Sequence, residues 1–207
     1  MNKSLLENMD SYDKLPEKAI TETGKISNKF LELGITSFKD ACLYLHNLPY
    51  GYNSNYDDEL ILFKESKGTC TSKHAIAAAL AQELNIPLFK KIGIYKFTEE
   101  ISWGAEKITE KYGIPYVPMI HCFLVYKEFQ FDLTEGNQNG KKTSIENFIH
   151  TEKVKPFISK KKEYLIFRKV IRKNILPDKE LKGIKERTLL KAREEAIKLL
   201  KANLKRE

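Results

Sequence analysis

Residues 68–87 read GTCTSKHAIAAALAQELNIP, and this stretch decides the fold of the chain. Its many alanines and its apolar spacing predict a largely buried helix over Thr69–Leu84, which Asn85-Ile86-Pro87 ends. A glycine precedes the helix, so a new element begins there. We therefore expect Cys70 in the first turn of a buried helix.

Strands are expected after this helix. Leu88–Phe97 reads as one strand, and Ile120–Tyr126 and Phe129–Thr134 are rich in aromatic and β-branched residues. Only Lys127-Glu128 separates the last two, which predicts a hairpin. The other expected elements are a strand over 163–171, a short helix or loop over 102–112, and helices over 37–48, 57–64, 144–150 and from 177 onward. The last of these carries a stripe of Leu190, Ile197, Leu200 and Leu204.

Length and composition favour a single folded domain. The 207 residues are 42% hydrophobic, which supplies a substantial core. Met1–Lys14 holds no apolar run of a signal peptide, and no stretch resembles a membrane span, so we expect a cytoplasmic protein with no membrane partner. The three cysteines, Cys42, Cys70 and Cys122, are expected to be thiols, because their odd number argues against a disulfide framework.

The net charge of +8 belongs to the C-terminal part of the chain. Residues 151–207 hold 19 Lys and Arg against 8 Asp and Glu, whereas residues 1–150 hold 17 against 20. Clustered basic residues can bind nucleic acid. The acidic residues are interspersed here, however, so we favour a solvated helix face and expect no nucleic-acid partner.

Cys70 carries the expected chemistry. Unpaired backbone N–H groups in the first turn of a helix stabilise a thiolate. The same groups can donate to the oxygen that becomes negative when a carbonyl is attacked. One turn could thus serve both the nucleophile and the oxyanion.

The predicted hairpin offers a base for this nucleophile. A turn centred on Lys127-Glu128 pairs Phe123 with Asp132, so His121 and Asp132 project from the same face as diagonal neighbours. Asp132 would then orient the imidazole of His121 and stabilise its charged form. The other ring nitrogen would serve Cys70.

The segment Lys67-Gly68-Thr69-Cys70, its helix and the Leu84-Asn85-Ile86-Pro87 exit into a strand resemble the transglutaminase-like branch of the papain-like cysteine hydrolase superfamily. The chain order of a Cys on a helix, a His on a strand and an Asp on the next strand is similar too. This resemblance covers roughly residues 45–135. Leu48-Pro49-Tyr50-Gly51 and the residues after it resemble a bacterial group of the superfamily without a settled function.

The resemblance implies an α+β fold with a papain/transglutaminase-like core, in which the Cys-bearing helix packs on an antiparallel sheet. It also implies a triad of Cys70, His121 and Asp132. We expect a domain over residues 1–175, with its core at about 36–175. A basic, highly charged helical extension would follow over 176–207.

The expected activity is cysteine-dependent acyl chemistry on an amide bond of a peptide, a protein or a small amide. Resolution of the thioester by water makes a peptidase or amidase, and resolution by an amine makes a transglutaminase. An arylamine acetyltransferase-like enzyme, which uses the same triad, is a minor rival. No metal and no organic cofactor is implied.

Other roles are open for several of these residues. His74 is the rival base, since it lies one turn after Cys70, but no orienting group is near it in sequence, so it could instead line the substrate cleft. A zinc site of Cys70, His74 and His121 and a non-catalytic binding module are the alternative functions. Tyr52, Asn53 and Trp103 are expected to supply the second oxyanion donor or to form the walls of the cleft. Cys42 and Cys122 are expected to pack in the core.

Overall fold

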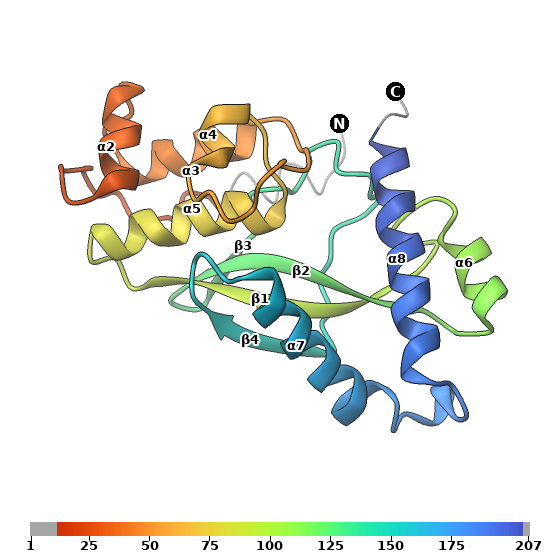
Figure 1. The fold of residues 1–207 in the computed structure, drawn as a ribbon. Helices are drawn as coiled ribbons and strands as arrows, with labels where there is room; N and C mark the ends of the chain where they lie inside the picture. The colour runs from red at the N-terminus through yellow and green to blue at the C-terminus, as the bar shows by residue number, and fades with distance from the viewer. Residues whose placement is uncertain (1–11, 205–207) are drawn as a thin grey trace. The chain divides into compact units, whose positions relative to one another are not determined.

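A computed structural model of the chain describes residues 12–204. It shows an α+β architecture in which four strands form an antiparallel sheet in the order β3-β2-β1-β4 (Figure 1). The helices are α2 (Lys25–Glu32), α3 (Phe38–Asn47), α4 (Ile61–Glu65), α5 (Cys70–Glu83), α6 (Ala105–Tyr112), α7 (Lys160–Val170) and α8 (Glu186–Asn203). The strands are β1 (Leu88–Phe97), β2 (Val117–Tyr126), β3 (Phe129–Phe131) and β4 (His150–Val154).

Helix α5 is the buried helix that the sequence predicts. All its residues from Ser72 to Ala81 are buried, which explains why small alanines fill it. Its first residue is Cys70, directly after the N-cap Thr69, and the chain leaves it through Asn85 into β1. The predicted position of Cys70 in the first turn is therefore confirmed.

The chain divides into two compact units, and the first comprises residues 1–91, 122–137 and 153–158. Within it, α2 and α3 pack against α5 (Figure 1). Apolar side chains from these helices, such as Phe30, Leu45 and Ile76, form its core together with Leu124 and Phe131 from the hairpin. This unit holds both Cys70 and Asp132.

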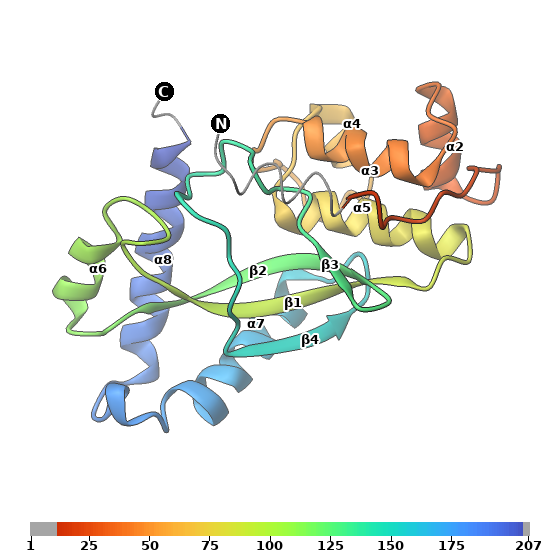
Figure 2. The same ribbon diagram turned by 180° about the vertical axis from the view of Figure 1, so that it is seen from behind.

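The second unit comprises residues 92–121, 138–152 and 159–207. Here α6 packs beside α8, as both ribbon views show (Figure 2). Helix α8, within the segment predicted as a basic helical extension, contributes buried side chains to the core of this unit. The buried stripe of α8 consists of Leu189, Ala192, Ala196 and Leu200, whereas Leu190 and Ile197 of the predicted stripe are only partly buried.

The predicted hairpin is confirmed together with its register. In β2 and β3, Leu124 pairs with Phe131 and Tyr126 pairs with Phe129 in antiparallel orientation. Continued by one pair, this register sets Phe123 opposite Asp132, as the sequence predicts.

Two predicted elements are wrong. Residues 163–171, expected to be a strand, belong largely to α7, because Ser159 caps a helix there by accepting a hydrogen bond from the Lys162 N–H at 3.3 Å. Ile166 and Val170, four residues apart, then face the core. Residues 144–149, expected to be helical, form no helix and lead into β4.

No helix among residues 12–204 is long and apolar enough to cross a membrane. Residues 1–11, which make up most of the segment from which we expect no signal peptide, lie outside the described part of the chain.

Candidate active site around Cys70

Cys70 is the most accessible of the three thiols. Its residue is 8% exposed, whereas Cys42 and Cys122 are at 1% and 0%. Burial raises the pKa of the Cys42 thiol, so this thiol remains protonated and unreactive. Cys42 and Cys122 thus lie in the core as the sequence predicts, and Cys70 is the thiol placed at a helix N-terminus.

A short parallel bridge holds the chain directly before Cys70. Tyr50 pairs with Gly68: the Gly68 N–H donates to the Pro49 carbonyl at 3.1 Å, and the Gly51 N–H donates to the Gly68 carbonyl at 3.2 Å. The two segments that carry the sequence resemblance therefore lie side by side. This pairing of Tyr50 and Gly68, 18 residues apart, has no local signal in the sequence.

Asn53 ties the same loop to the first turn of α5. Its buried side chain donates to the Lys67 carbonyl at 3.0 Å and to Glu65 Oε2 at 3.1 Å, and its Oδ1 accepts from the Ser72 hydroxyl at 2.9 Å. Ser72 Oγ in turn accepts from the Thr69 N–H at 3.0 Å. Both amide hydrogens of Asn53 are thus engaged, and Asn53 fastens the segment directly before Cys70. Its place at an oxyanion or a cleft wall stays a prediction.

His74 is held on both sides by backbone groups. Its Nε2 accepts from the Leu133 N–H at 2.7 Å, so Nδ1 carries the proton and donates to the Cys70 carbonyl at 2.7 Å. Asp132 Oδ1 lies 3.4 Å from Nε2. No orienting group is near His74 in sequence, but the fold brings a carboxylate and a backbone amide, from residues 132 and 133, to its ring.

This arrangement still argues against His74 as the base. The residue is fully buried, and each ring nitrogen already has a backbone partner. A base must accept the proton of the thiol, and Nε2 could do so only after losing the Leu133 N–H. His74 therefore acts as a neutral crosslink between the first turn of α5 and the segment after β3.

Asp132 lies just after β3 and is fixed by its own turn. Its Oδ1 accepts from the backbone N–H of Thr134 at 2.8 Å and from the Thr134 hydroxyl at 2.7 Å. Its carbonyl accepts from the Tyr12 hydroxyl at 3.0 Å. Burial and the charge of Asp132 raise the pKa of Tyr12, which keeps this donor protonated. Asp132 is thus held by hydrogen bonds to both its carboxylate and its backbone carbonyl.

Lys73 is a buried cation on the same helix that the sequence did not single out. Its Nζ donates to the carbonyls of His46 and Leu48 at 3.1 and 2.5 Å and to Asn137 Oδ1 at 2.6 Å. Burial lowers the pKa of Lys73 to about 8, and the charge of Asp132 opposes this shift. A lysine in a helix otherwise filled with alanine is the signal that could have identified it.

The remaining candidates lie in different surroundings. His121 is buried in β2, with its ring 6.5 Å from that of Tyr95 in an edge-on arrangement. Tyr52 is half-buried in the loop before Asn53 and packs edge-on against Tyr50. Trp103 is 53% exposed, in the second unit, with the Lys142 ammonium 5.4 Å from its ring. Cys70, Asn53, His74 and Asp132 therefore share the first unit, and His121 and Trp103 belong to the second.

Metal ligands do not gather in the described part of the chain. No group of three or more His, Cys, Asp or Glu side chains within residues 12–204 is arranged to hold an ion. His74 in particular uses both ring nitrogens on backbone groups. These observations argue against the zinc site of Cys70, His74 and His121.

Comparisons of the chain with models of protein families, with characterised proteins and with solved structures find no match.

Proposed function

We propose that this protein performs cysteine-dependent acyl chemistry on amide bonds, as a peptidase, an amidase or a transglutaminase-type enzyme. Cys70 is the nucleophile, His121 the base and Asp132 the group that orients the base. The observation that carries the proposal is the position of Cys70 as the first residue of α5, behind a loop fastened by Asn53 and Ser72.

Three further features support this assignment. Cys70 is 8% exposed as a residue, more than Cys42 and Cys122, although all three are buried. The pairing of β2 with β3 has the register from which the shared face of His121 and Asp132 is inferred. His74, the rival base, has both nitrogens occupied by backbone groups.

The proposed reaction proceeds through a thioester. His121 takes the proton of the Cys70 thiol as Sγ attacks the amide carbon, and backbone N–H groups at the start of α5 stabilise the oxyanion. The C–N bond then breaks, and His121 gives its proton to the leaving amine. Water or a second amine attacks the thioester, His121 accepts the proton of that acceptor, and Sγ leaves and is reprotonated.

Alkylation tests the nucleophile directly. Iodoacetamide labelling followed by peptide mass spectrometry reports each cysteine separately between about pH 5 and 9, and a peptide thiol has a pKa of about 8.5. We expect Cys70 to be labelled at least about tenfold faster than Cys42 and to react well below the pKa of a peptide thiol. His121→Ala should return the profile of Cys70 to that of an ordinary thiol, and the control His150→Ala should leave it unchanged.

Trapping then identifies the reaction. Peptides incubated with the unaltered protein and quenched in acid should leave an acyl group on Cys70, seen as a mass increase that Cys70→Ala protein and His121→Ala protein lack. A labelling rate at Cys70 equal to that of a free peptide thiol at every pH would instead favour the non-catalytic binding module.

A further inference from the structure

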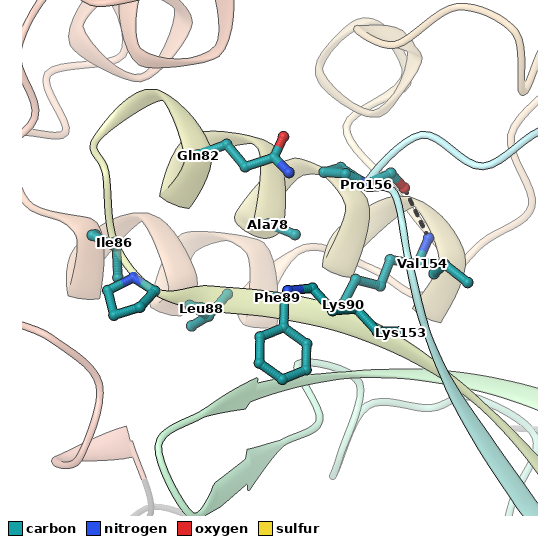
Figure 3. Close-up of a pocket in the computed structure, with 10 residues that line it drawn as sticks. Ala78, Gln82, Ile86, Leu88, Phe89, Lys90, Lys153, Val154 and Pro156 are labelled. Atoms are coloured by element: carbon teal, nitrogen blue, oxygen red, sulfur yellow. Dashed lines mark hydrogen bonds between the residues drawn. The ribbon is translucent and has the colours of Figure 1, made fainter.

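Lys90 is a buried lysine of β1 in the first unit, at 1% exposure. Its Nζ donates to the Thr71 carbonyl at 3.0 Å and to the Pro156 carbonyl at 3.1 Å, the second bond being the dashed line in Figure 3. Removing an ammonium from water is costly, and these hydrogen bonds offset part of that cost. The side chain is therefore held in place, and it joins α5, β1 and the segment around Pro156.

The Thr71 carbonyl belongs to the residue that follows Cys70, in the first turn of α5. The start of a helix carries partial positive charge, so acidic side chains are favoured there. Residues 70–73 instead read CTSK, and the Lys90 ammonium is bonded to their backbone. A turn with this additional positive charge suits a residue that works as an anion, and a thiolate is such an anion.

Side chains hold successive backbone groups of this turn. Ser72 Oγ accepts from the Thr69 N–H at 3.0 Å, and His74 Nδ1 donates to the Cys70 carbonyl at 2.7 Å. Lys90 adds the next group, the Thr71 carbonyl. Ser72 and His74 are residues of α5 itself, whereas Lys90 extends from β1. Lys90 therefore fixes the first turn relative to the strand that follows the helix.

Other titratable groups surround the same turn from the neighbouring elements. They are Lys73 and His74 of α5, His46 of α3, Glu65 and Lys67 before α5, Cys122 of β2, Asp132 after β3, and Tyr12. Lys73 Nζ is bonded to the end of α3, and the Asp132 carboxylate is bonded to Thr134. Among these groups and Lys90, it is the Lys90 charge that is bonded to the backbone next to Cys70. Because Lys90 is buried, salt screens this charge less than that of a surface lysine.

We propose that Lys90 is a positioning residue for the reaction of Cys70: its ammonium holds the first turn of α5 on β1 and adds a positive charge beside the nucleophile. It acts through the Thr71 carbonyl and exchanges no proton with the thiol or the substrate. Loss of this charge makes the thiolate less stable, so Cys70 then needs a higher pH to react. This inference rests on the function proposed for Cys70.

The pH profile of Cys70 alkylation by iodoacetamide tests this role in the full-length protein. In Lys90→Met the midpoint of the profile should rise by about half a pH unit or more, and the rate at neutral pH should fall at least about threefold. Lys90→Arg keeps the charge and the donors, so it should restore most of both. Lys91→Met is the matched control, because its side chain leaves the opposite face of β1, and it should change neither.

Two further variants separate positioning from stability. Leu84→Ala opens the core just after the other end of α5, so it should unfold at a lower urea concentration and keep the Cys70 profile of the unaltered protein. Lys90→Gln keeps an amide donor and lacks the charge, so it replaces Lys90→Met if that variant does not fold, with the same expected shift.

The role of Lys90 is overturned if the folded neutral variant has the profile of the unaltered protein, or if Leu84→Ala shifts the profile equally. A different result would contradict the function of Cys70 itself. That result is a profile of the unaltered protein equal to that of a free peptide thiol.

Discussion

His74 Nε2 lies 3.4 Å from Asp132 Oδ1, yet its hydrogen bond comes from the backbone N–H of the next residue, Leu133. The imidazole and the carboxylate are therefore within ion-pair distance, while the backbone N–H of Leu133 is a donor to the same ring nitrogen. The neutral ring connects the Cys70 carbonyl to the segment after β3. His74 thus joins the first turn of α5 to the segment that carries Asp132.

Replacement of His74 should destabilise the fold without changing the chemistry of Cys70. His74→Phe leaves the buried Leu133 N–H without its acceptor, which should cost about 1–3 kcal/mol in the free energy of unfolding. Urea unfolding at neutral pH measures this loss. The pH profile of Cys70 alkylation in the folded variant should match that of the unmodified protein. If His74→Phe instead behaved like His121→Ala in that profile, His74 would be the base.

Gly68 should tolerate no side chain. A Cβ at this position would lie 2.8 Å from Leu62 Cδ1 and 2.7 Å from Ser72 Oγ, which is itself bonded to Thr69 and Asn53. Gly68→Ala should therefore lower the free energy of unfolding by about 1–3 kcal/mol, as overpacking does.

Gly51→Ala is the matched control for Gly68→Ala. Its Cβ would approach Lys67 Cδ at 2.8 Å, but this side chain is partly exposed and can move away. Thermal unfolding of the two variants compares them directly. A smaller loss of stability for Gly68→Ala than for Gly51→Ala would contradict the close packing at the start of α5.

Removal of the Asn53 side chain should loosen the loop before Cys70. Asn53→Ala deprives the Lys67 carbonyl of a donor and Ser72 Oγ of its acceptor, at a cost of about 1–3 kcal/mol in unfolding free energy. Asn55→Ala, at an exposed position of the same loop, should change it by less than about 0.5 kcal/mol. Amide hydrogen exchange of residues 67–70 should accelerate only in Asn53→Ala, and unchanged exchange there would refute the positioning role.

Lys73 should make the stability of the protein rise in alkaline solution. Because its pKa is about 8 in the folded protein and lies below its ordinary value of about 10.5, the unfolded chain binds more protons between these pH values. The contribution of Lys73 to the free energy of unfolding should therefore increase as the pH rises from about 8 to 10.5. Urea titrations at several pH values measure the slope.

Lys73→Met tests the same residue by removal. It leaves the carbonyls of His46 and Leu48 without their donor, so it should lower stability by about 2–4 kcal/mol at neutral pH, and it should flatten the alkaline rise. The exposed Lys18→Met should do neither. An alkaline slope that persisted in Lys73→Met would assign it to other groups.

Much of the fold was predictable because its signals are local. The alanine-rich run with Gly68 before it and Pro87 after it predicted α5 within a residue at each end, and the bounds of β1 were predicted as observed. The two-residue turn at Lys127-Glu128 predicted the register of β2 and β3. In each case the turn residues and the apolar pattern favoured the same structure.

The errors arose where tertiary packing overrides propensity. Residues 164–167 read YLIF, a run typical of strands, but the Ser159 cap and the burial of Ile166, Phe167 and Val170 on one face favour α7. The candidate site shows a similar limit. The helix start at Cys70 and the hairpin register of Asp132 were readable from local patterns. The contacts of Asn53, the bridge at Tyr50 and the acceptors of Lys73 instead join residues between 12 and 64 positions apart.

The bridge between Tyr50 and Gly68 holds the chain directly before Cys70, so the position of Cys70 does not depend on the residues at the tip of the preceding loop. Both ends of residues 52–67 are fastened to each other, so this loop is closed at its base and can change length at its exposed tip near Asn55 at little entropic cost. Short insertions or loop exchanges there should leave α5 in place. The exchangeable part is therefore the exposed tip alone, because Asn53 and α4 stay in contact with the rest of the unit.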